Sequence, residues 1–200
     1  MKNLKNSFHK YAERIELYKR FGCDIEKERK FILEKASPLS GDILEIGTGK
    51  GYMAITLAQL GLNFTTVDIS AEEQEFARQN IKHLNLERFV DFRIENAEAL
   101  NFQNDSFDIA LSVNTLHHLK NPFKVIDEML RVLRPGGRIV LSDFTKKGFS
   151  IIEMIHKMEG RKHDAHTVKL VDVKKYLKDQ NLVFEESSSK YQEVFIVHKK

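Results

Sequence analysis

Five short apolar runs, separated by stretches with the pattern of amphipathic helices, constrain the fold of this chain more than any other feature. The runs are rich in β-branched or aromatic residues, as buried strands are. They span residues 43–46, 64–67, 89–94, 107–111 and 138–141. Strand–helix–strand units with short connections imply parallel pairing and right-handed crossovers. The pattern therefore predicts an α/β fold with a doubly wound, mostly parallel sheet and helices on both of its faces.

Signals at the helix ends delimit two of the intervening helices. Ser70 and Glu73 have the spacing of a capping box, in which each side chain accepts from the other residue's backbone amide. Asn121-Pro122 places a capping side chain before a proline at the first helical position. We expect the second helix to carry Leu133 on its buried stripe and to end at Pro135-Gly136-Gly137.

The two ends of the chain depart from this alternation. Residues 1–38 read as a helical cap, with one helix broken at Gly22 and a second capped by Asp24. Near the other end, two strand-like runs flank a short polar link, which joins antiparallel neighbours. The runs are residues 182–184 and 194–197, and the link is residues 187–190. We therefore expect a seven-stranded sheet that closes with an antiparallel hairpin. The expected parts of a single domain are a cap, a core and a closing segment, residues 1–38, 39–145 and 146–200.

Composition excludes several classes of protein. With 200 residues, 42% hydrophobic and 30% charged, the chain is expected to be globular rather than disordered. Thirty-two basic and 29 acidic side chains leave a net charge of +3, too small and diffuse to indicate nucleic-acid binding. Cys23 is the only cysteine, which excludes an internal disulfide and fits a reducing compartment. Because no membrane-span or export-signal pattern is seen, we expect a cytoplasmic protein.

The segment of residues 44–52, where the first strand runs into a helix, is the most informative for function. Gly47, Gly49 and Gly51 permit a sharp turn and the close approach of a ligand. A dinucleotide fingerprint would need a glycine where Tyr52 stands, and a P-loop would need Ser or Thr after the Gly-Lys pair. These departures disfavour an NAD-dependent dehydrogenase and a Walker-type site. A tight connection without a ligand stays open.

A carboxylate at the end of the second strand adds to the glycine turn. Asp68 would lie beside that turn if the two strands are neighbours, where it can accept hydrogen bonds from both hydroxyls of a ribose. The plainer alternative is a helix cap, since Ser70 follows. The glycine turn upstream favours the ribose role.

Five landmarks in order carry a family resemblance. They are Leu-Glu-Ile-Gly-Thr-Gly-Lys-Gly at 44–51, Val-Asp-Ile-Ser at 67–70, Glu-Asn-Ala-Glu-Ala-Leu at 95–100, the fourth-strand segment with Leu-His-His-Leu at 106–119, and Leu-Arg-Val-Leu-Arg-Pro-Gly-Gly-Arg at 130–138. The chain resembles class I S-adenosylmethionine-dependent methyltransferases, and is similar to the small-molecule type of ubiquinone and menaquinone biosynthesis. The resemblance implies a Rossmann-like fold, with S-adenosyl-L-methionine as cofactor and S-adenosyl-L-homocysteine as its product.

The resemblance also implies roles near the methionine portion of this cofactor. Gly47, Thr48 and Gly49 would pass close to it, and Glu45 would accept from its ammonium group. Tyr11 would fold over the cofactor from the N-terminal helix, with a plain core tyrosine as the alternative.

At the adenosine end, Asp68 would hold the ribose and Ile69 would pack on the adenine. Asn96, with Ala97 beside it, stands where the family often has a carboxylate; its carbonyl can still accept from the adenine amino group. Three residues at the end of the fourth strand would line the methyl-donor pocket: Ser112, Val113 and Asn114.

Methyl transfer requires little covalent chemistry from the protein, because aligning the acceptor with the methyl group carries most of the catalysis. His117 and His118 are the candidates for a general base, since they follow the fourth strand and titrate near neutrality. The alternative is that they are scaffolding, with one ring packed and the other capping or facing solvent.

A second group of polar residues, His156, His163, Asp164 and His166, has spacing that could reach one metal ion. A polar loop on the substrate side is the plainer interpretation, and no metal site is predicted.

The leading hypothesis is an enzyme that moves a methyl group from S-adenosylmethionine to a small-molecule acceptor by in-line displacement, as a monomer or homodimer. A non-catalytic S-adenosylmethionine-binding sensor or regulatory module is one alternative, since a donor pocket does not prove turnover. An RNA or protein methyltransferase is another. Base-modifying members typically carry Asp/Asn-Pro-Pro-Tyr/Phe where this chain has Asn114-Thr115-Leu116-His117.

Overall fold

The structure is a computed structural model that describes residues 2–160 and 168–200. Within these residues the strands form one seven-stranded sheet in the order β3-β2-β1-β4-β5-β7-β6. The strands are β1 (Ile43–Ile46), β2 (Phe64–Asp68), β3 (Val90–Ile94), β4 (Phe107–Val113), β5 (Leu133–Phe144), β6 (Val183–Ser188) and β7 (Gln192–His198). Strands β1 to β5 pair in parallel, and β7 is antiparallel to both of its neighbours. The predicted doubly wound sheet with a closing antiparallel hairpin is confirmed.

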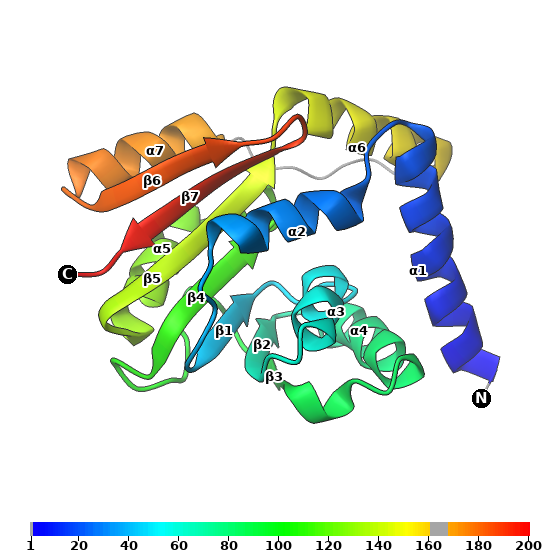
Figure 1. The fold of residues 1–200 in the computed structure, drawn as a ribbon, viewed down its shortest axis with the longest axis horizontal. Helices are drawn as coiled ribbons and strands as arrows, with labels where there is room; N and C mark the ends of the chain where they lie inside the picture. The colour runs from blue at the N-terminus through cyan, green and yellow to red at the C-terminus, as the bar shows by residue number, and fades with distance from the viewer. Residues whose placement is uncertain (1, 161–167) are drawn as a thin grey trace.

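Helices cover both faces of the sheet (Figure 1). One face packs against α1 (Lys2–Arg20), α2 (Ile25–Lys35), α3 (Tyr52–Gln59), α4 (Ala71–His83) and α6 (Lys146–Met158). The other packs against α5 (Pro122–Val132) and α7 (Leu170–Asp179). Short 3₁₀ helices, η1 (Glu87–Phe89) and η2 (Leu116–His118), complete the connections. None of the described helices has the length and apolar character needed to cross a bilayer.

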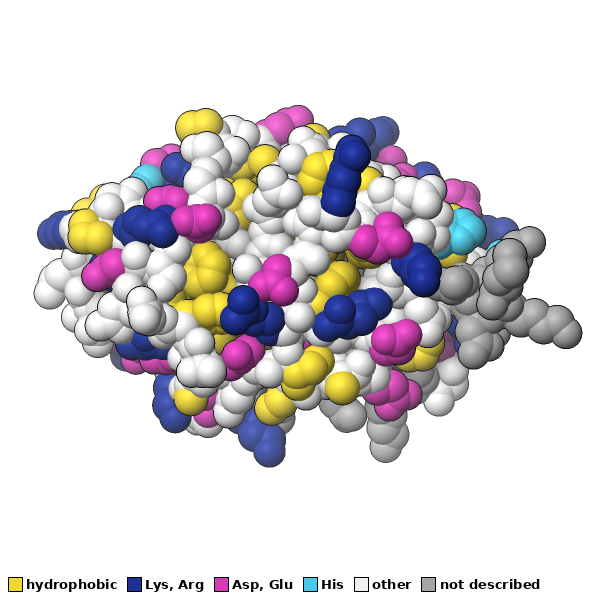
Figure 2. Space-filling view, turned by 90° about the horizontal axis from the view of Figure 1, so that it is seen from below, with side chains coloured by type: hydrophobic (Ala, Val, Ile, Leu, Met, Phe, Trp, Pro, Cys, Tyr) yellow, Lys and Arg dark blue, Asp and Glu magenta, His cyan; other side chains and the backbone are white. Residues whose placement is uncertain are grey.

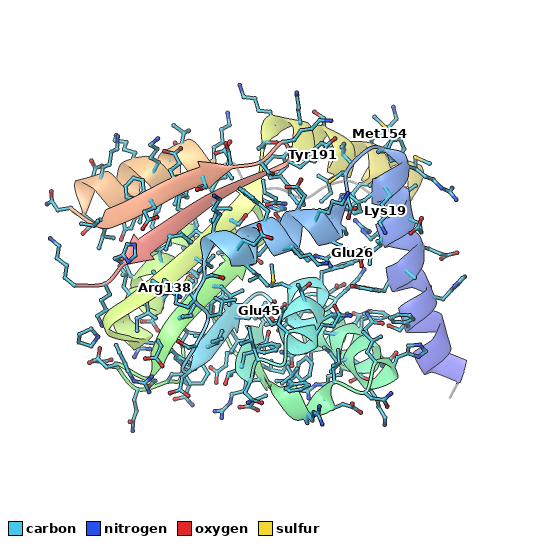
Figure 3. All side chains as sticks on the ribbon, in the orientation of Figure 1. Lys19, Glu26, Glu45, Arg138, Met154 and Tyr191 are labelled. Atoms are coloured by element: carbon cyan, nitrogen blue, oxygen red, sulfur yellow. The ribbon has the colours of Figure 1, made fainter. Side chains whose placement is uncertain are left out.

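Side chains along β1 point alternately to the two faces of the sheet, and this alternation decides where its one charged side chain lies. Leu44 and Ile46 pack in the core beneath α5 and α7, whereas Ile43 packs on the opposite face. Glu45 shares the parity of Ile43. Its carboxyl is therefore buried on the face that α2 and α3 cover, and Figure 3 labels it below α2.

The strand order reverses between β1 and β4, which are neighbours in the sheet but are separated by two strands in the chain. The loops that leave the carboxyl ends of these two strands diverge at this point, and ligands of open α/β sheets bind there. The glycine turn directly follows β1, and the Leu-His-His-Leu segment follows β4. The topology therefore brings two of the sequence landmarks to one crevice.

The N-terminal helices are tied to the sheet at several points, some of them labelled in Figure 3. Lys19 at the end of α1 pairs with Glu26 in α2 at 3.0 Å. Tyr191, in the turn before β7, donates its hydroxyl to the carbonyl of Gly22 at 2.9 Å. Arg138 of β5 donates to the carbonyl that directly follows α2, also at 2.9 Å. These contacts hold α2 across the sheet at the edge of the crevice.

Some element boundaries differ from those predicted. Helix α5 ends at Val132, and Leu133 is already the first residue of β5. The pairing with β4 then skips from Leu133 to Arg138 while β4 advances only from Phe107 to Ile109, so residues 134–137 bulge out of the ladder. The Pro-Gly-Gly segment therefore shapes this bulge instead of ending the helix. Two further shifts are that Ser187 and Ser188 belong to β6, and Phe89 to η1.

The helix caps also differ in part. Ser70 accepts from the amide of Glu73 as predicted, but the amide of Ser70 donates to Asp68 instead of to Glu73. Asn121 precedes Pro122 as expected, yet its side chain makes no cap hydrogen bond and donates to Glu98. In both places a carboxylate from outside the expected motif provides the acceptor.

Candidate active site

The glycine turn needs glycine for two separate reasons. Gly47 has a φ of +86°, and a Cβ added there would lie 2.4 Å from Oγ1 of Thr115. Gly51 has a φ of +84°, and its added Cβ would lie 2.9 Å from the Cβ of Ala77 in α4. The turn therefore packs directly on the loop after β4 and on α4. A side chain at either position would push these segments apart.

Asp68 connects the glycine turn to the end of β2. Its Oδ2 accepts from the amide of Gly49 at 2.7 Å, and its Oδ1 accepts from the amide of Ser70 at 2.9 Å. The N-cap of α4 is Ser70, so Asp68 supports the cap residue through its amide, and the same carboxylate lines the pocket. Its hydrogen bond to Gly49 places it beside the glycine turn.

A chain of buried hydrogen bonds runs beneath the turn. Thr66 of β2 donates its hydroxyl to Oε2 of Glu45 at 2.6 Å. Since that proton is used, the 2.7 Å contact between the hydroxyls of Thr48 and Thr66 has Thr48 as donor. Gln74 of α4 donates to Thr48 in turn at 3.2 Å. The order of donors fixes Glu45 as the acceptor at the end of the chain.

The pKa of the Glu45 carboxyl is shifted in a way that suits the binding of a cationic group. Burial, together with the nearby charge of Asp68, raises its pKa to about 8. The hydrogen bond from Thr66 and the charge of Arg29 act in the opposite direction. A ligand ammonium group at this position would favour the charged form and would lower the pKa again.

One pocket of about 780 Å³ opens at the carboxyl ends of the strands. Most of the residues that the sequence predicts for the site line it: Glu45, Gly47, Thr48, Gly49, Asp68, Ile69, Asn96, Ala97, Val113, Asn114, His117 and His118. Ile69 is 72% exposed, which gives the pocket edge an uncovered apolar surface next to Asp68.

Two predicted residues do not line this pocket. Tyr11 is buried, and its ring stacks on Tyr52 with the centroids 5.0 Å apart, so the core alternative describes its position. Tyr18, two turns further along α1, lines the pocket instead. Ser112 is fully buried because the alternation along β4 turns it to the same side as Ala110, away from Val113.

The two asparagines of the site differ in what their carbonyls do. Oδ1 of Asn96 accepts from the amide of Glu98 at 3.0 Å, so one of its two lone pairs is used locally. Asn114 adopts a φ of +54°, and its buried Oδ1 has no hydrogen-bond partner among the described residues. A buried acceptor without a donor is costly, and at the pocket wall it suits a ligand N–H or O–H group.

His117 is held by an aspartate that the sequence reasoning missed. Nδ1 of His117 lies 2.7 and 2.9 Å from the two carboxylate oxygens of Asp143, and the His117 amide donates to the same carboxylate. Only 2% of His117 is exposed, whereas His118 is exposed and its ring lies 4.0 Å from that of His117. With the Nδ1 proton directed to Asp143, Nε2 carries the lone pair that can accept a proton.

The cap contributes cationic and aromatic side chains to the pocket wall. Arg14 and Tyr18 of α1 and Arg29 of α2 all line it. Nη1 of Arg14 lies 3.0 and 2.9 Å from the two carboxylate oxygens of Glu159, and its Nη2 lies 2.9 Å from Nε2 of His156. Nothing in the local sequence around these residues marks them as functional. Asp143 had a weak signal, as a polar residue at the carboxyl end of a predicted strand.

The predicted metal-spaced group is only partly described. His156 lines the pocket beside Arg14, whereas His163, Asp164 and His166 lie outside the described residues. Among the residues that are described, no three His, Cys, Asp or Glu side chains gather in a way that could hold a metal ion.

Comparison with known proteins accords with this geometry. Residues 44–141 match the family model of a methyltransferase domain, from β1 through the glycine turn and the histidine pair into β5. These residues have the sequence of a methyltransferase domain. The matched segment includes both chain segments that the strand-order reversal brings together.

Similar proteins cover different shares of this domain. A stretch of 100 residues is 39% identical to an uncharacterized methyltransferase of Mycolicibacterium vanbaalenii, covering 50% of this chain and 38% of that protein. A ubiquinone/menaquinone biosynthesis C-methyltransferase of Geotalea daltonii is 26% identical over 160 residues, covering 76% of this chain and 68% of the relative. A crystal structure of a protein from Pyrococcus horikoshii OT3 has a TM-score of 0.73 at 19% identity, covering 95% and 92% of the two chains. The last likeness shows that the fold extends beyond the matched domain.

Proposed function

We propose that this chain transfers the methyl group of S-adenosylmethionine to a small-molecule acceptor. The observation that carries the proposal is one pocket lined both by the glycine turn with Asp68 and by His117, whose ring Asp143 holds from behind the pocket wall. Its volume of about 780 Å³ is in the range of small-ligand pockets. Methyl donor and acceptor must meet in one enclosed space, which this arrangement provides.

The residues present fit the cofactor. Glu45 offers a buried acid for an ammonium group, and Asp68 offers carboxylate oxygens at the pocket wall. Ile69 offers an exposed apolar surface for the adenine, and Asn114 offers an acceptor without an internal donor. When bound, S-adenosylmethionine supplies a methyl group on a positively charged sulfur. The glycine turn lets the main chain approach that ligand closely.

His117 is the proposed general base for an acceptor that must lose a proton. Asp143 fixes the ring and its tautomer, and it stabilises the imidazolium that forms when Nε2 takes up the proton. Asp143 therefore acts as a positioning residue. His118 remains a second candidate, since it lines the same pocket. The rest of the catalytic effect comes from holding the acceptor in line with the methyl group.

The surroundings of the pocket support a small acceptor over a nucleic acid. Tyr18 of α1 and Ile25 of α2 line the pocket, so the cap forms part of its wall. On the face drawn in Figure 2, Lys and Arg side chains are interspersed with Asp and Glu among the coloured residues, without a continuous basic band. A polynucleotide backbone needs such a band for binding.

The first test is calorimetric titration of the protein with S-adenosylmethionine, S-adenosylhomocysteine and NAD. We expect the two sulfur nucleosides to bind and NAD not to bind. The variant Asp68→Ala should bind S-adenosylhomocysteine about 10- to 100-fold more weakly, since the ribose hydroxyls and the Gly49 amide lose their acceptor. No binding of either nucleoside to a folded, ligand-free sample would refute the proposal.

A second measurement separates an enzyme from a sensor. Methyl-labelled S-adenosylmethionine is incubated with the protein and an extract of small metabolites, and release of S-adenosylhomocysteine is followed together with the labelled product. Turnover supports an enzyme, whereas binding without turnover over a broad set of extracts supports the non-catalytic sensor.

A further inference from the structure

Gln192 places a buried amide at the wall of the pocket. It is the first residue of β7, and only 2% of it is exposed. Ladder pairing puts it opposite Phe144, the last residue of β5. Its side chain shares the parity of Val194 and Ile196, which pack on the face of the sheet that the cap covers. The amide therefore lies beneath the cap, at the pocket that the residue lines.

Only one end of this amide has a partner within the protein. Ser142 donates its hydroxyl to Oε1 of Gln192 at 3.0 Å and shares the same proton with the carbonyl of Glu193 at 2.8 Å. Nε2 of Gln192 makes no hydrogen bond within residues 2–160 and 168–200, and it is not fully covered by protein. Since the residue lines the pocket, a partner for these two N–H groups must come from there.

The order of the strands separates Gln192 from the cofactor landmarks. The glycine turn follows β1, and Asp68 is the last residue of β2. On the other side of β4 the sheet continues with β5 and then β7. Neighbouring strands lie about 4.8 Å apart, so β7 is about 14 Å from β1. A cofactor held by these landmarks leaves the part of the pocket at β5 and β7 for the acceptor.

Apolar side chains from three elements line the pocket on the same face of the sheet as this amide. They are Phe144 of β5, Ile152 of α6 and Ile25 of α2, and all three are buried. An ion placed among them would lose its hydration without gaining a charged partner. These surroundings therefore favour a neutral group as the partner of the amide.

The charged side chains that the cap helices contribute to the wall have other contacts. Arg14 of α1 is bound by Glu159. In α2, Glu28 accepts a hydrogen bond from the hydroxyl of Ser189. Arg29 stacks on the aromatic ring that follows the glycine turn, on the cofactor side. The amide of β7 is thus the neutral donor on this part of the wall.

We propose that Gln192 determines acceptor specificity by binding a neutral oxygen atom of the methyl acceptor. The inference deepens the proposed function and rests on it. Nε2 donates a hydrogen bond to a carbonyl or hydroxyl oxygen, and the apolar side chains contact the hydrocarbon part of the molecule. An acceptor without this oxygen would leave the N–H groups covered and unpaired, which is costly. The substrate class is therefore an uncharged, largely apolar compound that carries oxygen.

The test compares two probes of the same shape on protein saturated with S-adenosylhomocysteine. Acetophenone carries a carbonyl oxygen, and α-methylstyrene has a CH₂ group in its place. Dissociation constants are measured by ligand-observed NMR for the wild type and for Gln192→Met, which has a similar length but no N–H group. Gln180→Met is the matched control, because it makes the same change at an exposed position directly after α7.

The expected result is a change in selectivity between the probes. In Gln192→Met the dissociation constant of acetophenone, divided by that of α-methylstyrene, rises about 10-fold over the wild-type ratio, whereas Gln180→Met keeps that ratio. Gln192→Glu should bind acetophenone still more weakly, because a carboxylate oxygen then faces the carbonyl oxygen. The affinity of Gln192→Met for S-adenosylhomocysteine and its melting temperature should stay close to wild type. Ser142 still has the carbonyl of Glu193 as its acceptor.

An unchanged ratio in Gln192→Met would overturn the inference, and so would failure of the saturated wild type to bind acetophenone. A fall in melting temperature or in affinity for S-adenosylhomocysteine along with the changed ratio would also overturn it, because a purely structural role would produce that pattern. Failure of the wild type to bind S-adenosylhomocysteine contradicts the proposed function itself, so the two failures are distinguishable.

Discussion

The two sides of the pocket are built in different ways. On the cofactor side, the glycine turn, Asp68 and the buried chain from Gln74 to Glu45 come from β1, β2 and the helices that directly follow them. On the cap side, Arg14 and Arg29 line the pocket together with His156 and Gln192, which follow them by more than a hundred positions in the sequence. The first side is a product of neighbouring βα units. The second exists only when both ends of the chain fold back over the sheet.

This difference predicts how the two sides respond to substitution. The cofactor side is held by backbone geometry and short buried hydrogen bonds, so changes there affect stability and cofactor binding together. The cap side is held by a few long-range contacts, so changes there should affect the acceptor step with little loss of fold. His117, which Asp143 holds at the end of β5, lines the same pocket and belongs to neither group.

The largest expected effect is that of a substitution at His117 on the rate of methyl transfer. His117→Gln should lower kcat for methyl transfer by about 100- to 10,000-fold, because the acceptor proton loses its base, while the dissociation constant of S-adenosylhomocysteine stays unchanged. Asp143→Asn should lower kcat as well, since it no longer fixes the ring. Turnover is measured with labelled S-adenosylmethionine and an acceptor found in the extract screen. His118→Gln tests the second candidate in the same assay, and normal rates for both variants would remove the general-base role.

A glycine pair tests how tightly the cofactor side is packed. Gly51→Ala should destabilise the fold by about 2–4 kcal/mol, because its Cβ would meet Ala77 and its positive φ is strained. Gly61→Ala has a similar φ of +75° but no atom within 4 Å of its added Cβ, so only about 1–2 kcal/mol is expected. Urea unfolding measures both. Equal losses would show that the contact with α4 is not tight.

Glu45 provides a pH dependence of stability. Its folded-state pKa of about 8 lies above the ordinary value of 4.5, so the folded protein binds this proton more tightly than the unfolded chain. The resulting stabilisation is complete below pH 4.5 and is lost as the pH rises through about 8. Glu45→Gln lacks this titration. Its melting temperature relative to wild type should therefore rise between pH 5 and pH 8, and a constant difference would contradict the buried, neutral carboxyl.

The smallest expected effect is on the cap side. Glu159→Gln breaks the pair with Arg14 that joins the end of α6 to α1. Because both side chains are partly exposed, we expect a loss of about 0.2–1 kcal/mol that shrinks as salt is added. Glu153→Gln removes the same charge from an exposed position of α6. A loss in Glu159→Gln of several kcal/mol would mean that this pair, and not packing, holds the cap.

Much of the cofactor side was predictable from the sequence. The glycine spacing, the strand that ends at Asp68 and the segment around Asn114 are local patterns, and the parallel sheet then brings their ends together. The predictions of element ends failed where another group competed with the expected one. The Ser70 amide donates to Asp68, two residues before it, instead of to Glu73. The Leu133 segment joined β5 because distant β4 offered it hydrogen bonds.

The sequence by itself determined the fold class, the motifs that follow the strands and the place of the glycine turn. Periodicity and glycine conformation are properties of a few consecutive residues, so a local pattern is enough to predict them. Only the tertiary structure decided that Asp143 holds His117, that Tyr18 and not Tyr11 reaches the pocket, and that Arg29 is buried beside Glu45. These pairings depend on the rotation of each helix over the sheet. That rotation is set by the packing of the whole core, which no local pattern contains.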